Sequence, residues 1–511
     1  MMAGDSRTQG GLRISPQQTG TRTTYIIVLC VVLLLCFLLN SLITDAPIRS
    51  DARQNLQSAY NIQQWGVFSR STFLERPSPD NYREPLPPAI TAAFIFLLGE
   101  KACVDGDCRE HGFNIRTIKK INILWACIVL CASALLAYRI TLSRFWTVAV
   151  VILIYFSFLR NPAYIDSLYT EIPAAAGMLL SALCLMTWLR APKPLTSFLA
   201  GIILGCLVLT KAIFFYVLFP LLVVAAVFVV SRRRRTSLGH HVKCLLMVCI
   251  GVLITIGPWL VRNTAHFGSA QIASRGGLAL YTRALINQMD PYEYLAAFHY
   301  WGPGAYRRLV YKTALDIDDR DYERGGRAVR LNDSDSSSFF QDDVAAQKEG
   351  RPEDAVSFYG IARAQRVKAA MEMRNAGHRH AAHAADTYLR SQALRMIVKH
   401  PLRHLSATVP LAWRGMWCFY GAGVLTILGA VAYGSFLFVC LYGVVRKRWD
   451  IVALIAVPFL LLLCNALLSN NLPRFNAPAI PFMVMSMAFS LQLMAQWLGS
   501  RFKMRGNNSA G

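Results

Sequence analysis

The sequence predicts an all-α polytopic membrane protein, a bundle of about 10–12 transmembrane helices with extracytoplasmic loops and a helical cap. Apolar residues make up 54% of the 511 residues and charged residues only 16%, unlike a soluble enzyme of this size. The apolar residues also come in blocks without charge, such as 25–43, 212–230 and 245–261. Most blocks are near the length that crosses a hydrocarbon core, and basic residues gather at their ends.

The formal net charge of +24 would suggest a nucleic-acid partner if the protein were soluble. Here, however, the basic residues form short clusters at 232–235, 446–448 and 501–505, each close to the end of an apolar block. Such clusters are typical of cytoplasmic anchors under the positive-inside rule. We therefore expect the membrane as a partner and no nucleic acid.

The chain is expected to begin with a cytoplasmic leader over residues 1–24, a first span, and a first extracytoplasmic loop over 45–86. A cleaved signal peptide is the alternative, because a basic, polar segment precedes the first apolar block. That block is long and no small-residue cleavage site precedes Asp45, which favours an uncleaved span. Residues 25–261 then form one transmembrane module that includes the first loop.

The remaining apolar stretches raise the number of candidate spans to eleven. The positive-inside rule places 262–406 outside, makes 407–498 the C-terminal transmembrane helices and leaves 499–511 as a cytoplasmic tail. It also places both the first loop and the loop that begins at Asn161 outside, although three apolar runs separate them. One run within 87–159 is therefore expected not to cross as a simple helix. The stretches after the first span lie at 87–99, 119–138, 145–159, 172–189, 195–210, 212–231, 242–261, 422–445, 451–468 and 475–498.

The polar region 262–406 holds most of the acidic residues of the chain. Residues 352–400 have a helix-like pattern of alanines and basic residues, whereas 333–338 has the composition of a loop. No repeat period is visible, so we expect a helical extracytoplasmic cap.

Acidic residues stand near both ends of the first loop, as Asp51 and Glu84. A carboxylate at a membrane surface can take a proton from an acceptor hydroxyl, and a second one can orient the acceptor or bind a divalent metal ion. The alternative is that Asp51 only caps a helix beginning near Ala52, and for Asp51 taken alone capping is the better interpretation.

A second pair of carboxylates, Asp166 and Glu171, lies in the short polar loop after Asn161. On a helix these two residues would face somewhat different directions, so they do not form a paired site by themselves. Acidic residues at the end of a span are costly without partners or water, which makes both residues functional candidates. A solvated loop carboxylate is the alternative for Asp166.

Three arginines stand at expected span ends or turns on the extracytoplasmic side: Arg262, Arg275 and Arg474. Arg262 follows Trp259, and a tryptophan with a snorkelling arginine commonly anchors a helix end. The functional alternative is that these arginines grip a phosphate carried by a lipid.

Several different short motifs follow one another along nearly the whole chain. They comprise Asp51, Ala59, Gly66, Phe68 and Arg83-Glu84-Pro85, then Pro258, Trp259, Arg262, Asn263, Phe267, Gly268, Gly276 and Gly277, and finally Arg474, Phe475, Pro478 and Pro481. In these motifs the chain resembles membrane glycosyltransferases of the GT-C fold, the family that includes protein O-mannosyltransferases and the lipid A aminoarabinose transferase. Many relatives have Glu where this chain has Ala52 and Tyr where it has Phe475, which leaves the acceptor and any metal site open.

The resemblance implies a glycosyltransferase that moves a hexosyl or pentosyl group from a polyprenyl-phosphate-linked sugar to a glycan, lipid or protein acceptor. Asp51 would be the general base, and Glu84 with Asp166 or Glu171 would shape the acceptor or metal site. Arg262 and Arg474 would hold the donor phosphate. We assign Tyr82, Arg83 and Arg275 to substrate binding as well.

The resemblance also implies a multi-pass protein of the plasma (inner) membrane that acts on the cell envelope with an extracytoplasmic active face. A transporter or lipid flippase is the main alternative. It would be expected to show internal repeats and broken helices near the midplane, whereas the polar residues here concentrate at span ends. A scaffold or receptor would show no dependence on these carboxylates.

Overall fold

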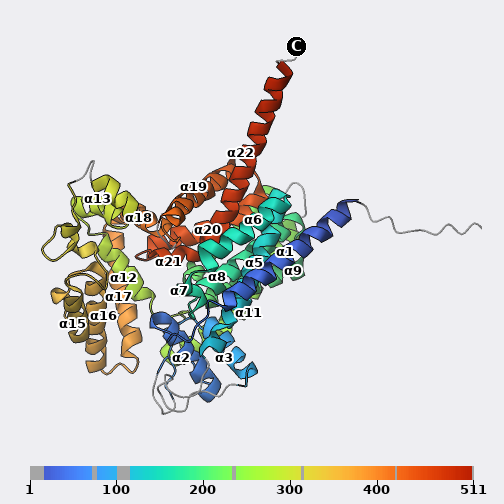
Figure 1. Cartoon of the computed structure of the whole chain (residues 1–511). Helices are drawn as coiled ribbons and strands as arrows, with labels where there is room; N and C mark the ends of the chain where they lie inside the picture. Colours follow the sequence, from blue (N-terminus) through green and yellow to red (C-terminus); the bar gives the residue numbers. More distant parts are fainter. Residues whose placement is uncertain are drawn as a thin grey trace, which may run out of the picture.

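The computed structural model describes residues 16–71, 77–99, 115–232, 238–311, 316–419 and 423–508, which form helices and turns without a strand (Figure 1). Six of the helices in these ranges are long and apolar enough to span a membrane, and five further apolar helices have 10–17 residues. The chain is therefore an all-α polytopic membrane protein, as its sequence predicts. The start of the expected leader and the basic residues 233–235 lie outside the described residues.

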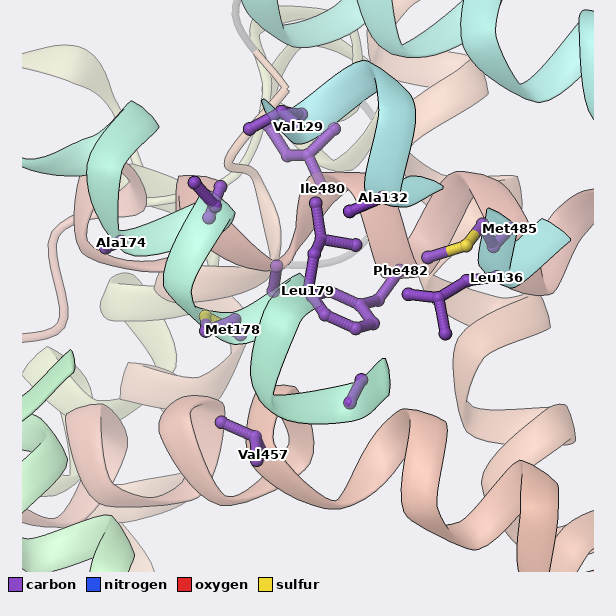
Figure 2. Close-up of a cluster of buried hydrophobic side chains, with 14 of the residues drawn as sticks. Val129, Ala132, Leu136, Ala174, Met178, Leu179, Val457, Ile480, Phe482 and Met485 are labelled. Atoms are coloured by element: carbon purple, nitrogen blue, oxygen red, sulfur yellow. The ribbon is translucent and has the colours of Figure 1, made fainter. Parts of the chain in front are cut away.

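Each apolar stretch that the sequence identifies coincides with a helix of the described residues. The core of the bundle joins helices from both ends of the chain, since side chains of α5, α8, α20 and α22 meet in one cluster that includes Leu136, Met178, Val457 and Phe482 (Figure 2). The helices of the bundle are α1 (Pro16–Asn40), α5 (Ile121–Thr141), α6 (Arg144–Ile154) with η1 (Tyr155–Leu159), α8 (Glu171–Arg190), α9 (Pro194–Thr210), α10 (Ile213–Arg232), α11 (Leu238–Phe267), α19 (Val424–Val445), α20 (Trp449–Leu468) and α22 (Ile480–Asn508).

The expected first loop contains α2 (Ser50–Trp65), and the apolar run that follows it forms the short helix α3 (Leu86–Leu97). Its 12 residues extend about 18 Å, well short of a hydrocarbon core of about 30 Å. Ile95 near its end packs in one cluster with Ala52 of α2 and with Ile118 of α4 (Ile115–Lys119), just before α5. The chain thus begins α5 at the end of the bundle where α2 lies, which removes the conflict in the topology count.

The two ends of the bundle differ in charge and in structure. One end carries basic turns, such as Arg139 with Arg144 and Arg190 with Lys193. The other end carries α2, α3, the turn with α7 (Pro162–Ile165) and the cap, and Figure 1 shows the C-terminal half of α22 projecting away from that end. We call the second end the cap end.

The cap covers one side of the cap end and has its own apolar core, with Trp301, Tyr322 and Phe358 among its buried side chains. The predicted helix-like stretch 352–400 is η4, α16 and α17, and 333–338 is a loop, as expected. The helices of the cap are α12 (Gly276–Ile286), α13 (Pro291–Tyr300), α14 (Gly304–Tyr311), η2 (Asp319–Tyr322), η3 (Val329–Leu331), α15 (Phe340–Glu349), η4 (Pro352–Asp354), α16 (Phe358–Asn375), α17 (Ala381–Lys399) and α18 (Pro401–Met416).

The start of α12 is fixed to α17 by a tight contact. The carboxylate of Asp386 accepts hydrogen bonds from the backbone N–H groups of Gly277 (2.9 Å) and Leu278 (3.1 Å). A Cβ atom on Gly277 would lie 1.9 Å from the carbonyl oxygen of Asp386, so only glycine fits there. The close packing at Gly277 therefore sets where Arg275, at the N-cap position of α12, meets the bundle.

Candidate active site

A cavity of about 480 Å³ opens where α2, the transmembrane helices and the cap meet. Segments far apart in the sequence contribute to its wall. Of the residues that the sequence singles out, it is lined by Asp51, Arg83, Glu84, Glu171, Arg275 and Arg474. We call this cavity the arginine pocket.

Asp51, in the first turn of α2, is surrounded by three arginines from three different segments. Arg83 bonds to Oδ1, whereas Arg474 Nη2 lies 2.8 Å and Arg275 Nη2 lies 3.8 Å from Oδ2. The side chain of Asp51 is 27% exposed, so the cluster faces the cavity and remains within reach of a ligand. Asp51 is not the N-cap residue of α2, because the helix begins at Ser50 and its N-cap position is Arg49, which argues against the capping interpretation.

The three arginines dominate the electrostatics of Asp51. Burial by itself would raise the pKa of this carboxyl, but the guanidinium groups, Arg275 first, outweigh burial and hold the pKa well below its usual range. In return the carboxylate raises the pKa of Arg275 against the effect of burial. The whole pocket is lined by three carboxylates and five basic side chains, so it keeps positive charge that can bind an anion.

Glu171 and Lys211 form a second pair of charged residues in the arginine pocket. Glu171 Oε1 lies 3.6 Å from Lys211 Nζ, at the facing ends of α8 and α9. Glu171 Oε2 and Lys211 Nζ are buried and make no hydrogen bond among the described residues. Both groups therefore have hydrogen-bonding capacity left for a ligand. Glu84 is more occupied, because its Oε1 accepts a hydrogen bond from the N–H of Ala212 (3.1 Å).

Arg474 owes its position to a buried network of asparagines. Asn465 donates to Asn476 Oδ1 (2.8 Å), Asn476 donates to Asn471 Oδ1 (2.8 Å), and Asn471 donates to the carbonyl of Leu411 (2.7 Å). These bonds connect α20, the loop after it and α21 (Pro473–Asn476) to α18. Because buried amide networks of this kind have one satisfied geometry, they fix the loop that carries Arg474.

Asp166 lies outside the arginine pocket, in a structural contact at the base of the first loop. It accepts a hydrogen bond from Lys119 Nζ (2.9 Å) and two more from Thr44, from N at 2.7 Å and from Oγ1 at 2.6 Å. Lys119 also donates to the carbonyls of Thr44 (2.9 Å) and Ala46 (2.7 Å), and its side chain is fully buried. The structure therefore does not bring Asp166 together with Glu171.

Arg262 and Tyr82 do not line the arginine pocket either. Arg262 Nη1 donates to the carbonyl of Asp80 (2.8 Å), and its guanidinium lies 4.6 Å from the ring centroid of Trp259. Tyr82 accepts a hydrogen bond from Arg366 Nη1 (3.2 Å), which ties the first loop to the cap. Both side chains hold the first loop in place, Arg262 against α11 and Tyr82 against α16.

The sequence-based prediction missed three basic residues of the arginine pocket: Lys211, Arg390 and His404. Lys211 carries a usable signal, because a lone lysine between two apolar runs at the cap end departs from the positive-inside pattern. Arg390 and His404 come from α17 and α18, and only the packing of the cap turns them toward the pocket.

The described part of the chain has no group of three histidine, cysteine or acidic side chains placed to hold a metal ion. The carboxylates of the arginine pocket are paired with arginine, lysine or a backbone N–H instead.

No protein-family model matches the chain, and no curated protein matches it. Among solved structures, the chain is similar to the arabinosyltransferase EmbB from Mycobacterium smegmatis, with 13% sequence identity and a TM-score of 0.32. The match covers 96% of this chain and 43% of that enzyme, so the chain spans less than half its length. A TM-score this low carries no argument about fold or activity.

Proposed function

We propose that the chain is a glycosyltransferase with a GT-C-like bundle, which transfers a sugar from a polyprenyl-phosphate donor to a glycan, lipid or protein acceptor. The observation that carries the proposal is the cluster of three arginines around Asp51 in a cavity with an apolar side. A lipid-borne phosphate sugar and its hydroxyl acceptor need three features together. They need cations for the phosphate, a carboxylate for the acceptor hydroxyl and an apolar wall for the lipid.

In the proposed reaction the acceptor oxygen forms a bond to the anomeric carbon of the sugar, and the bond from that carbon to the phosphate oxygen breaks. The acceptor proton moves to the carboxylate of Asp51, and polyprenyl phosphate leaves with the bonding electrons. Negative charge grows on the leaving phosphate, where Arg275 and Arg474 stabilise it more in the transition state than in the ground state. Bidentate contacts from guanidinium groups suit this role.

Binding of the donor also prepares Asp51 to act as the base. In the free protein Arg275 and Arg474 both lie near Oδ2 of Asp51, and a carboxylate so paired takes up a proton poorly. A donor phosphate competes for these two guanidinium groups, while Arg83 stays on Oδ1. Oδ2 then becomes available to the acceptor hydroxyl only when the donor is in place.

The apolar side of the arginine pocket supports a lipid-borne donor. Tyr216, Leu280, Leu394 and Ile397 line it. The cap continues this apolar surface outward, because Val398 on α17 is 76% exposed and, on α18, Leu402 is 79%, Leu405 59% and Val409 55% exposed. Leu402, Leu405 and Val409 follow one another at helical spacing and so share a face of α18, which packs against the transmembrane helix α20. A polyprenyl chain can approach the pocket along this surface from within the bilayer.

The distribution of basic turns supports an extracytoplasmic active face in the plasma (inner) membrane, since those turns lie at the end opposite the cap. Single cysteines in a cysteine-free variant test this. Arg53→Cys in α2 and Asp335→Cys in the cap should react with a membrane-impermeant thiol reagent in intact cells, and Arg446→Cys should not. Labelling in the opposite pattern would reverse the proposed orientation.

The activity is tested with purified full-length protein. Mass spectrometry of copurified lipids should identify the polyprenyl-linked sugar, which then serves as the donor in a transfer assay. Asp51→Asn should lower the rate by about 10²- to 10⁴-fold, because an amide cannot accept the proton. Asp45→Asn, at an exposed carboxylate nearby, is the matched control and should retain the wild-type rate. An unchanged rate in Asp51→Asn would remove Asp51 as the base.

A further inference from the structure

The cap contains a second cavity, of about 520 Å³, between α13, the turns η2 and η3, and the loop that carries Arg474. It shares no lining residue with the arginine pocket. Three aromatic residues, Tyr300, Trp301 and Tyr322, contribute to its wall. We call it the cap cavity.

The aromatic wall of the cap cavity is held rigidly. The rings of Tyr300 and Tyr322 lie 4.6 Å apart between centroids, and the Tyr300 hydroxyl donates to Asn332 Oδ1 (2.6 Å). Tyr322 is buried, with its hydroxyl 2.9 Å from Nδ1 of His299. Trp301 and Tyr322 are almost fully buried, so the partly exposed ring of Tyr300 is the aromatic surface that the wall offers to a ligand, and it needs no further ordering.

The rest of the wall is polar but carries little net charge. The buried Arg414 is neutralised by Asp333, which accepts two hydrogen bonds from Nη2 at 2.9 and 3.0 Å. The remaining charged residues of the wall are Arg307, Asp319 and Glu323. Two arginines against three carboxylates give a formal charge of −1, which disfavours an anionic ligand. The many polar groups equally disfavour a lipid chain.

We propose that the cap cavity binds a neutral, hydroxyl-rich carbohydrate, which is the glycan part of the acceptor. A sugar ring has an apolar C–H face and a rim of hydroxyl groups. The ring of Tyr300 can cover the C–H face, while carboxylate, amide and guanidinium groups can bind the hydroxyl rim. The assignment to the acceptor rests on the proposed glycosyltransferase activity, whereas the assignment to carbohydrate rests on the cavity alone.

The position of the cap cavity suits an acceptor that reaches the reaction centre. Pro473 lines the cap cavity, while the next two residues, Arg474 and Phe475, line the arginine pocket. Arg414 also donates to the carbonyl of Asn470 (3.3 Å) in the same loop. The two cavities thus lie on either side of one short segment, and an acceptor of several sugars contacts both.

Direct binding tests the carbohydrate class. Full-length protein in detergent is applied to an array of neutral hexose and pentose oligosaccharides, with inorganic phosphate tested in solution as the anionic alternative. We expect at least one neutral oligosaccharide to bind, and Arg307→Ala combined with Asp319→Asn to weaken this binding at least tenfold, or about 1.4 kcal/mol. Arg308→Ala, at the exposed neighbouring arginine, is the matched control and should bind like the wild type.

Two results would overturn the proposal. They are the absence of binding by every neutral oligosaccharide, and wild-type binding in the double variant with confirmed thermal stability. Transfer kinetics separate this proposal from the activity itself. The double variant should raise KM for a long acceptor while KM for the donor stays unchanged. A wild-type protein that binds oligosaccharide but transfers nothing would refute the glycosyltransferase and leave the carbohydrate site standing.

Discussion

Asp51 and Asp166 both stand near the ends of apolar runs, and both have a basic side chain at hydrogen-bond distance. They differ in the number of cations and in access. Asp166 meets the single, fully buried Lys119, and the remaining bonds of that pair go to Thr44 and Ala46. Asp51 meets three arginines at the edge of a cavity. A balanced and closed ion pair contributes to the fold, whereas an excess of cations around an accessible carboxylate leaves charge for a ligand.

The largest expected effect on stability is in the Asp166 pair. Asp166→Asn leaves Lys119 with an uncompensated charge inside the protein, which should cost about 3–5 kcal/mol. Thermal unfolding in detergent measures this, and transfer per folded molecule should stay close to the wild-type rate. Adding Lys119→Met should recover much of the loss, while the exposed Lys120→Met changes stability by less than about 0.5 kcal/mol. A full loss of transfer in well-folded Asp166→Asn would place Asp166 in the active site after all.

Much of the fold could be predicted from the sequence, because long blocks without charge have few alternatives to a membrane helix. The exception is α3. Its apolar run looks like a span, and only its packing on Ala52 and Ile118 shows that it returns to the end where it began. In the sequence the extra apolar run appears only as a conflict between the sides of the membrane expected for the first loop and for the loop after Asn161. The sequence does not show which of the three runs between them causes the conflict.

The site could be predicted in part. Asp51 and Arg474 are singled out by the motifs that carry the family resemblance, since Asp51 taken alone is better interpreted as a helix cap, and Arg275 stands directly before two glycines of the same motifs. Lys119 could not be predicted as a partner of Asp166, because a basic residue before a span is ordinarily interpreted as a membrane anchor. Its burial against Asp166 depends on tertiary contacts. That pairing is why the sequence could not distinguish the structural Asp166 from Glu171, which faces the arginine pocket.

A smaller effect is expected from Arg474→Lys. Lysine keeps the positive charge but loses the planar fork of the guanidinium, so contact with both Asp51 and a phosphate should weaken. We expect KM for the donor to rise by roughly tenfold, consistent with loss of about 1.5 kcal/mol from one charged hydrogen bond. Arg403→Lys, at an exposed arginine of α18 outside the pocket, is the control. Wild-type donor kinetics in both Arg474→Lys and Arg474→Ala would exclude Arg474 from donor binding.

The smallest expected effect is a shift in pH between the profile of kcat and the profile of kcat/KM for the donor. This shift tests whether the bound donor takes the arginines away from Asp51. The ratio kcat/KM for the donor reports the free protein, whereas kcat reports the donor complex. In the free protein the arginines lower the pKa of Asp51. Its carboxylate therefore stays ionised at pH values below the ordinary aspartate pKa of about 3.9, and the acid limb of the kcat/KM profile lies below that pH as well. Once phosphate takes Arg275 and Arg474, burial again raises the pKa, and the acid limb of kcat moves to higher pH.

The variant Arg275→Gln sharpens the same test, because it removes the arginine with the largest effect on Asp51. Its kcat/KM profile should move up in pH toward the wild-type kcat profile, while an Arg308→Ala control leaves both limbs where they are. The measurement is initial rate against pH, restricted to the range in which thermal unfolding shows each variant folded. Coincident acid limbs for kcat and kcat/KM in the wild type would mean that the arginines stay on Asp51 when the donor binds. Asp51 would then act as a fixed counter-ion that orders the phosphate site, like Asp166 beside Lys119, and another group would have to take the acceptor proton.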